Sequence, residues 1–240
     1  MSGSVAAVLL AAGSGSRFEA GANKVFIDVL GRPLLAWAAT PFVGSADVGR
    51  FVVVAAAGEV ERCRTLLPGA TVIRGGATRH ESERLGIEAL APAIVAGEVD
   101  LVLVHDAARP FVTATDLQAV IAAARRTGAA IPALPAAPGV ATVDAGGRVR
   151  GRLADLWTAQ TPQGFEARLL LTAHRRAAAE GFEGTDTASV VERLGAQVVV
   201  VRGSPDNVKL TTPSDLALAE ALGARFPGAA PLLDPDMLPA

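Results

Sequence analysis

Short apolar runs alternate with amphipathic stretches along most of this chain of 240 residues. Runs rich in Val, Ile and Leu predict strands at residues 5–11, 51–57, 71–73, 101–104, 130–134 and 197–201. Most of these runs are apolar throughout, which is typical of strands that helices cover on both faces. We therefore expect a sheet that lies inside the molecule.

The segments between these runs have a helical period. They predict helices at residues 33–39, 59–66, 82–91, 115–126, 166–179 and 213–222. The last helix has a start signal, with Thr212 as N-cap, Pro213 at the first helical position and Asp215 at the third. Gly181 is a stop signal for the helix before it. This alternation predicts an α/β fold with a doubly wound, mostly parallel sheet over residues 1–225.

One stretch breaks the alternation. Residues 140–153 contain two short alternating runs around Gly146-Gly147, a pattern that predicts a β-hairpin. A hairpin has no place inside a parallel sheet, so we expect a projecting arm over about residues 138–153. Two isolated strands are marginal in water, and an amphipathic arm therefore favours a homodimer built through it. The tail, residues 226–240, has four prolines in fifteen residues and is expected outside the core.

Composition excludes several classes of protein. Half of the residues are apolar and the net charge is −2, with no Lys/Arg block, which argues against a nucleic-acid partner. The single cysteine, Cys63, cannot form an internal disulfide, and His80, His105 and His174 do not have zinc-site spacing. No apolar run approaches the length of about 20 residues that a helix needs to span a bilayer. We expect a cytoplasmic protein with no membrane partner.

The first motif is A-A-G-S-G-S-R-F at residues 11–18, directly after the first predicted strand. Glycines let successive backbone N–H groups converge on a phosphate. No Gly-Lys-Ser/Thr closes the loop as in a Walker motif, and Phe18 stands where a dinucleotide fingerprint has its third Gly. The pattern therefore indicates a phosphate-binding loop with two cations, Arg17 and Lys24, or else a solvated turn.

Two further motifs follow predicted strands. H-D-A-A-R-P at residues 105–110 lies at a carboxyl end, where open α/β sheets bind ligands. Asp106 is suited to hold Mg²⁺, or alternatively caps the following turn. His105 is either a base or, more simply, a packed residue. G-G-A-T-R-H-E-S at residues 75–82 lies between a strand and a helix, where Gly-Gly permits close backbone approach.

Together these motifs resemble, in order and spacing, the cytidylyltransferases that act on 2-C-methyl-D-erythritol 4-phosphate in isoprenoid biosynthesis. The resemblance covers about residues 5–222 and includes Leu156-Trp157 before Thr161-Pro162-Gln163, Thr185-Asp186 before Ala188-Ser189, and Asn207-Val208-Lys209. It implies a Rossmann-like nucleotidyltransferase that joins CTP to the acceptor with Mg²⁺ and releases pyrophosphate. Two alternatives stay open: a cytidylyltransferase for another polyol phosphate such as ribitol 5-phosphate, and a non-catalytic nucleotide-binding homologue.

The resemblance also implies roles for individual residues. Arg17 and Lys24 would stabilise charge at the α-phosphorus, and Asp106 would bind Mg²⁺. The implied nucleotide-binding residues are Ala11, Ala12, Gly13, Gly15, Ser16, Gly76, Ser82 and Arg109. Thr161, Thr185 and Lys209 would contact the acceptor phosphate or its polyol. A phosphate monoester is already mostly a dianion at pH 7, so the reaction needs positioning and cations more than a general base.

Three positions depart from the family's pattern. Asn23 replaces the Pro before the loop lysine, and Pro138-Gly139 replaces an Asp-Thr before the arm. The family has an acceptor-positioning Arg eight residues before the Thr of T-P-Q, where this chain has Leu153 next to Arg152. In an extended arm a shift of one residue reverses the face, unless a bulge restores the register. We expect an intact nucleotide half and an altered acceptor half, with Arg152 as the candidate replacement.

Overall fold

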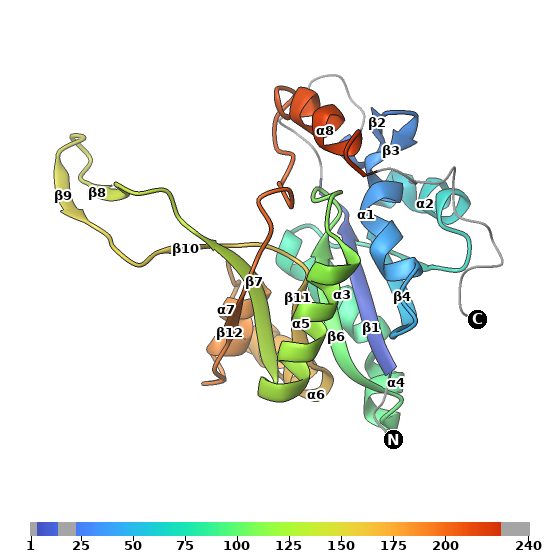
Figure 1. Cartoon of the computed structure of the whole chain (residues 1–240). Helices are drawn as coiled ribbons and strands as arrows, with labels where there is room; N and C mark the ends of the chain where they lie inside the picture. The colour runs from blue at the N-terminus through green and yellow to red at the C-terminus, as the bar shows by residue number, and fades with distance from the viewer. Residues whose placement is uncertain (1–3, 14–22, 227–240) are drawn as a thin grey trace.

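The computed structural model describes residues 4–13 and 23–226 (Figure 1). Its centre is an eight-stranded sheet among these residues. Strand β1 (Ser4–Ala11) pairs in parallel with β4 (Val48–Ala55) on one side and with β6 (Val99–Asp106) on the other. Strand β5 (Thr71–Arg74) extends the parallel ladder beyond β4. The doubly wound, mostly parallel α/β architecture predicted from the sequence is thus confirmed.

Side chains of β1 alternate between two apolar layers, which explains its continuous apolar sequence. Val5, Ala7 and Leu9 lie in one buried cluster, whereas Ala6 and Val8 lie in the other. The first layer is covered by α1 (Leu34–Val43), α2 (Val60–Leu66) and α5 (Ala114–Thr127). The second is covered by α3 (Arg79–Ala89), α4 (Ala91–Ala96), α6 (Ala167–Glu180) and α7 (Thr187–Glu192). The sequence patterns missed α4 and α7, each of six residues.

The other half of the sheet contains antiparallel strands that the apolar pattern did not predict. Strand β11 (Gln163–Glu166) runs antiparallel between β6 and β7 (Ala129–Pro135), and β10 (Trp157–Ala159) pairs with the far part of β7. Strand β12 (Val199–Arg202) pairs with β7 in parallel. A Cβ on Gly164 would lie 2.9 Å from the Val120 side chain. Glycine in β11 therefore lets α5 pack directly on the sheet.

Near the end of the described chain, α8 (Asp215–Gly223) begins later than its sequence signal predicted. Ser214, not Thr212, is the N-cap, and Pro213 lies before the helix. The Asp215 carboxylate accepts hydrogen bonds from the backbone N–H groups of Thr211 and Thr212, so these residues form a turn that precedes the helix. Helix α6 ends as expected, with Gly181 in the left-handed region at φ 63°.

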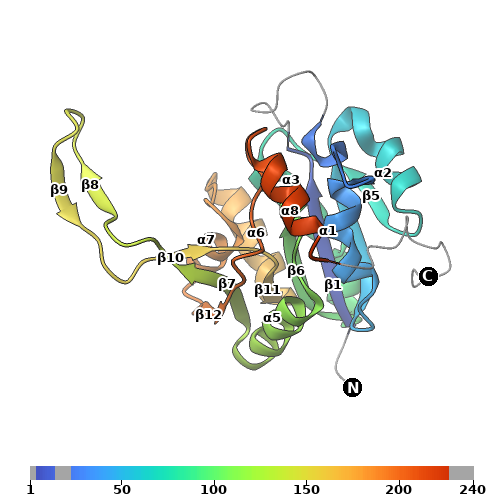
Figure 2. The same cartoon turned by 45° about the horizontal axis from the view of Figure 1, so that its top comes forward.

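The predicted hairpin is present as an arm that projects from the body (Figures 1 and 2). It consists of β8 (Ala141–Val143) and β9 (Val149–Arg152). Thr142 lies opposite Gly151 but Val143 lies opposite Val149, so Arg150 is the extra residue of a bulge. The bulge is on the side of Arg152 toward the arm's tip. It leaves the pairing of Arg152 with Ala141 in place.

Four further short elements lie before α1 or between β4 and α2 in the chain. They are η1 (Lys24–Phe26), the paired strands β2 (Asp28–Val29) and β3 (Arg32–Pro33), and η2 (Ala57–Glu59). Within the described ranges, no helix combines the length and apolarity that crossing a bilayer requires. The cytoplasmic location remains a prediction from the sequence, and the Pro-rich tail from residue 227 onward lies outside the described residues.

Candidate active site

The candidate site lies at the carboxyl end of β1, the strand that has β4 on one side and β6 on the other. The carboxyl ends of β1 and β6 are adjacent, with Leu10 paired to Asp106. Such a topological switch point opens a crevice beyond the strands. A cleft of about 340 Å³ occupies this place. Its lining includes seven residues predicted from the sequence, Ala12, Gly13, Lys24, Gly76, Ser82, Asp106 and Lys209. It also includes one charged residue that was not predicted, Arg79.

Asp106 is the anionic centre of this cleft. It is the last residue of β6 and is 8% exposed. Its Oδ2 accepts a hydrogen bond from Lys209 Nζ at 2.6 Å, and its Oδ1 accepts one from Arg79 Nη2 at 3.2 Å. Burial alone would raise the pKa of Asp106, but the charges of Arg79 and Lys209 outweigh it and hold that pKa well below its usual value. The ionised carboxylate therefore faces two cations, and does not cap the following turn.

The cleft carries more positive than negative charge. Among the described residues that line it, Lys24, Arg79 and Lys209 are cationic, and Asp106 alone is anionic. Lys24 and Lys209 are also the only two lysines of the whole chain. A flexible ammonium acts as a compact point charge for phosphate oxygens. The arrangement is suited to binding a polyanionic phosphate group together with a metal cation.

Lys24 lies in a short turn that Asn23 fixes by side-chain hydrogen bonds. Asn23 is the N-cap of η1, and its Oδ1 accepts a hydrogen bond from Val25 N at 3.3 Å. Its amide also donates to the carbonyl of Ala11 at 3.4 Å, which ties the turn to the end of β1. Lys24 Nζ donates to the carbonyl of Leu210 at 3.1 Å. Gly15, Ser16 and Arg17 of the same loop lie outside the described residues, so their roles remain predictions.

Lys209 comes from a distant segment that is anchored by buried polar groups. Asn207 Nδ2 donates to the carbonyl of Thr161 at 2.8 Å, and Gln160 Nε2 donates to the carbonyl of Ser204 at 2.8 Å. From Ala159 on β10 to Gly164 on β11 the chain advances by five residues. Their pairing partners on β7, Ala133 and Ala130, are only three residues apart. The two extra residues form the irregularity that carries Gln160 and Thr161 toward this segment.

Arg109 holds the same segment and does not line the cleft. Its guanidinium donates to the carbonyl of Asn207 at 2.8 Å and to that of Ala159 at 3.3 Å. Burial lowers the pKa of Arg109, although the charge of Asp106 acts in the opposite direction. Its nucleotide-binding role stays a prediction, while the structure gives it a positioning role for the loop that carries Lys209.

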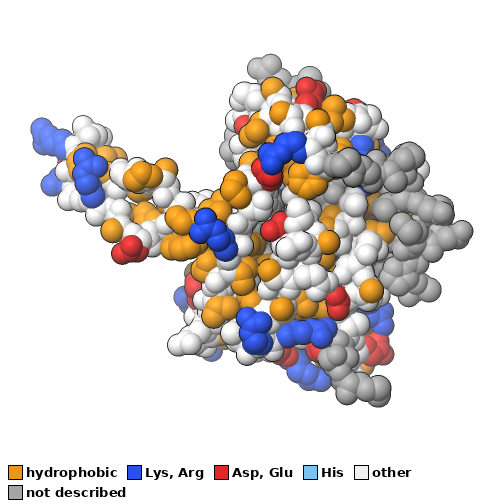
Figure 3. Space-filling view, viewed as in Figure 1, with side chains coloured by type: hydrophobic (Ala, Val, Ile, Leu, Met, Phe, Trp, Pro, Cys, Tyr) orange, Lys and Arg blue, Asp and Glu red, His pale blue; other side chains and the backbone are white. Residues whose placement is uncertain are grey.

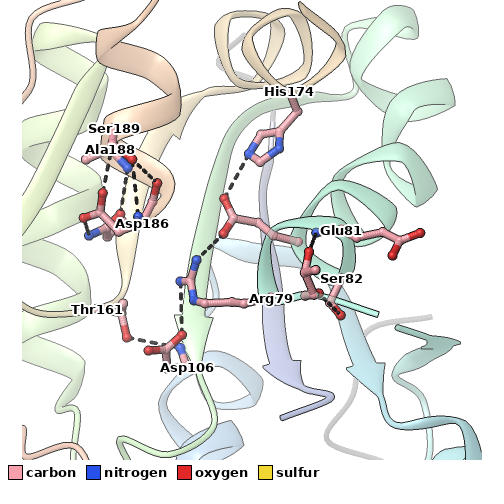
Figure 4. A network of polar contacts seen from close by, with 12 residues as sticks. Arg79, Glu81, Ser82, Asp106, Thr161, His174, Asp186, Ala188 and Ser189 are labelled. Carbon is pink, nitrogen blue, oxygen red and sulfur yellow. Dashed lines mark hydrogen bonds and ion pairs between the residues drawn. The ribbon is translucent and has the colours of Figure 1, made fainter. Parts of the chain in front are cut away.

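His105 is a packed residue and not an exposed base. It is fully buried, and burial lowers its pKa to about 4. Its Nε2 lies 3.0 Å from the carbonyl of Arg109, so Nε2 carries the proton and Nδ1 accepts from the Thr161 hydroxyl at 2.8 Å. The Thr161 oxygen in turn accepts from the backbone N–H of Asp106 at 3.1 Å (Figure 4). This chain of bonds fixes the end of β6.

The turn between β5 and α3 forms the opposite wall. Gly76 N donates to Ser82 Oγ at 3.1 Å, and Ser82 Oγ donates to the carbonyl of Thr78 at 2.9 Å. A Cβ on Gly75 would lie 2.5 Å from the Cβ of Ala12, so a glycine is required where this turn approaches the end of β1. The Ser82 hydroxyl thus shapes the turn at the cleft, and its contact with a nucleotide stays a prediction.

Three predicted acceptor residues do not line the cleft in this chain, and one of them is Thr161, whose hydroxyl bonds to His105 and to the backbone N–H of Asp106. The other two are Thr185 and Arg152. Thr185 is exposed, directly before Asp186, whose carboxylate accepts from Gln163 Nε2 at 2.9 Å. Arg152 is exposed on β9 of the arm. Neither is among the residues that line the cleft. For these predicted contacts to form, the acceptor must approach from the side of the molecule on which these residues lie, or a second chain must supply its arm.

Arg79 is the cleft residue that the sequence patterns missed. It donates from Nη2 to Asp106 and from Nη1 to Glu83 Oε2 at 2.7 Å. Helix α3 begins at Arg79, three residues before the predicted start at Ser82. That error placed Arg79 in a loop and concealed its i,i+4 relation to Glu83. Thr78 was the available signal, because it is an N-cap whose hydroxyl accepts from Glu81 N.

Comparisons with known proteins extend over nearly the whole chain. The family model described as 2-C-methyl-D-erythritol 4-phosphate cytidylyltransferase matches residues 5–225. Proteins of that name from Bacillus licheniformis and Rhodococcus jostii are 39% identical over 223 residues and 44% identical over 225 residues. These alignments cover 90% and 92% of this chain, and 94% and 95% of the relatives.

Solved structures agree with this match. The crystal structure of 2-C-methyl-D-erythritol 4-phosphate cytidylyltransferase from Thermus thermophilus superimposes with a TM-score of 0.72 at 37% identity. The match covers 90% of this chain and 98% of that one. The structural similarity therefore extends over most of both chains.

Proposed function

The chain belongs to the 2-C-methyl-D-erythritol 4-phosphate cytidylyltransferase family, and on this premise we propose that it transfers the cytidylyl group of CTP to 2-C-methyl-D-erythritol 4-phosphate. The products are 4-diphosphocytidyl-2-C-methyl-D-erythritol and pyrophosphate. The observation that carries the proposal is the ionised Asp106 between Lys209 and Arg79, with Lys24 in the same cleft at the switch point. Two polyanionic substrates require such a cluster of cations.

The chemistry follows from the charges of the substrates. An oxygen of the acceptor's phosphate dianion attacks the α-phosphorus of CTP, and the bond from that phosphorus to the bridging oxygen of the β-phosphate breaks. Pyrophosphate leaves with the electron pair. The nucleophile is already deprotonated at pH 7, so no side chain needs to remove a proton. Lys24 and Lys209 hold the phosphates in line and stabilise the negative charge that develops between them.

Asp106 fits the requirements of a divalent cation, Mg²⁺ in our proposal. Its carboxylate supplies hard oxygen donors and is ionised at neutral pH. Across the described parts of the chain, no three His, Cys, Asp or Glu side chains gather as metal ligands. One carboxylate together with substrate phosphates is a usual set for Mg²⁺. When bound, the cation would neutralise phosphate charge, while Arg79 and Lys209 balance the carboxylate.

The arm supports the proposal of a homodimer. Its exposed hydrophobic side chains include Val143 (60%), Val149 (59%) and Leu153 (47%). Figure 3 shows hydrophobic side chains along the arm and basic ones near its free end. A hollow of about 470 Å³ lies at its base, between residues 135–140 and 153–157. A second copy of the chain would cover these surfaces and bring an arm residue to the neighbouring cleft.

Light scattering at micromolar concentration is expected to give about twice the chain mass of 24.4 kDa. The double substitution Val143→Asp and Val149→Asp should shift the protein toward a monomer, because it places charge in the proposed interface. Leu218→Asp is the matched control, since Leu218 is 47% exposed on α8. A wild-type monomer with full activity would remove the argument for the dimer.

Arg152→Ala is expected to raise the KM for the polyol phosphate by about tenfold and to change the KM for CTP little. The reason is the loss of a charge-assisted bond to the acceptor phosphate alone, worth about 1.4 kcal/mol per tenfold. Leu153→Arg in the same variant should recover part of the loss. Arg150→Ala is the control on the same strand, because the guanidinium of Arg150 is already engaged in an ion pair with Asp144 at 2.8 Å. Normal acceptor kinetics in Arg152→Ala would make Arg152 a solvated arm residue.

A panel of acceptors tests the proposed function. We expect CTP-dependent pyrophosphate release with 2-C-methyl-D-erythritol 4-phosphate, and a kcat/KM for ribitol 5-phosphate at least tenfold lower. A higher kcat/KM for another polyol phosphate would assign a different acceptor to the same reaction. CTP binding without turnover on any acceptor would make the protein a binding homologue.

A further inference from the structure

Glu83 is a buried carboxylate that the proposed reaction does not use. It lies on α3, four residues after Arg79, and is 1% exposed. Its Oε2 accepts from Arg79 Nη1 at 2.7 Å, and its Oε1 accepts from His174 Nε2 at 2.9 Å. A buried charge is costly unless it is paired and hydrogen-bonded. Both oxygens of Glu83 meet that condition through partners on two different helices.

Glu83 carries a negative charge at neutral pH. Burial alone would raise its pKa, but the hydrogen bond from His174 and the charge of Arg79 outweigh it, so the pKa is lowered. Arg79 consequently lies between two carboxylates, with one nitrogen on Glu83 and another on Asp106. In Figure 4, Arg79 lies between Asp106 below it and His174 above it. A planar guanidinium that is bonded from two sides has little freedom to turn.

His174 supports this arrangement from α6, behind the wall of the cleft. Its side chain is fully buried and its ring stacks on that of His80, with 5.1 Å between the ring centroids. Within the described part of the chain, His174 Nδ1 has no hydrogen-bond partner. The single polar bond that the structure assigns to this imidazole is therefore the one that orients Glu83.

We propose that Glu83, oriented by His174, is a positioning residue that holds Arg79 on the cleft wall beside Asp106 and so increases the affinity of the cleft for CTP. Without the negative charge of Glu83, the guanidinium would turn toward Asp106 and form a closer pair with it. That pair would occupy the carboxylate and withdraw the cation from the phosphates. The inference rests on the proposed function only in taking CTP as the ligand.

Glu83→Gln tests the inference, because it keeps the volume of the side chain and removes the charge. A Gln presents one oxygen where Arg79 and His174 each donate an N–H, so one of them loses its acceptor. We expect the Kd for CTP, measured by calorimetry with Mg²⁺, to rise about tenfold, equivalent to about 1.4 kcal/mol. Glu88→Gln on the same helix is the control, since Glu88 pairs with Arg175 on the protein surface.

A double-mutant cycle separates positioning from a merely structural role. In an Arg79→Gln background, Glu83→Gln should add less than about twofold to the loss of CTP affinity, because the residue it positions is gone. His174→Leu should reproduce the effect of Glu83→Gln, whereas His174→Gln, which keeps a donor, should be milder. If Glu83→Gln does not fold, these two His174 variants make the same comparison.

Unchanged CTP affinity in the folded Glu83→Gln or His174→Leu protein would overturn the inference. An equal, additive loss in the Arg79→Gln background would also overturn it. These outcomes are distinct from a failure of the proposed function. A wild-type protein that binds CTP but transfers no cytidylyl group would refute the function and leave the role of Glu83 intact.

Discussion

Replacing Lys24 by Ala is expected to lower kcat by about 10²- to 10³-fold while the fold is retained. Removing one preorganised group that faces transition-state charge typically costs this much. Lys24 lines the cleft, and its ammonium donates to the carbonyl of Leu210, next to Lys209. The turn that carries it is fixed by Asn23, so the substitution should affect the charge in the cleft more than the backbone.

Steady-state kinetics with saturating CTP and acceptor measure this effect, and a thermal melt shows whether the fold survives. Arg126→Ala is the matched control, because Arg126 is an exposed cation on α5 that does not line the cleft. The same loss is predicted for Arg17→Ala from the sequence. Near-normal turnover in Lys24→Ala would show that the reaction centre lies elsewhere.

Asp106→Asn is expected to reduce kcat/KM by about 10²-fold or more. The substitution keeps the shape of the side chain and removes the anion that Lys209 and Arg79 share. It also removes the carboxylate that we propose holds the divalent cation. Without that carboxylate, the cation would no longer be held where it stabilises charge on the phosphates. We therefore expect the activity of Asp106→Asn to respond weakly to added Mg²⁺.

A Mg²⁺ titration of initial rates, together with CTP binding by calorimetry, measures this second effect. Asp47→Asn is the control, because Asp47 is a partly exposed carboxylate outside the cleft that accepts from Gln118. Wild-type turnover with the wild-type Mg²⁺ response in Asp106→Asn would exclude Asp106 from the metal site and from the reaction.

Much of the fold was predictable because both faces of the parallel strands are buried. A strand such as β1 is apolar at nearly every position, and this pattern is visible without tertiary information. Strand β11 was not predictable in this way. It has four residues, including Gln163 and Gly164, and depends on its neighbours β6 and β7 and on the close packing of α5. Local propensity carries little weight where such contacts decide the structure.

The candidate site was predictable to the extent that its residues follow strands. Ala12, Gly13 and Asp106 meet because β1 and β6 are adjacent, which the doubly wound pattern implies. Lys209 was predicted only from the resemblance, since buried bonds from Asn207 and Gln160 bring its segment to the cleft. Arg79 and Glu83 were missed, because a charged pair on a helix is usually solvated and nothing local indicates that Glu83 is buried.

The reaction that we propose for this chain is transfer of the α-phosphoryl group of CTP, with its cytidine, to a phosphate acceptor. Its most direct test uses purified protein, Mg²⁺, 2-C-methyl-D-erythritol 4-phosphate and CTP that is labelled at either the α- or the γ-phosphate. We predict that the α-label appears in the acceptor product and the γ-label in pyrophosphate, in equal amounts. Label from the γ-position in the acceptor product, or no transfer from the α-position, would exclude this reaction.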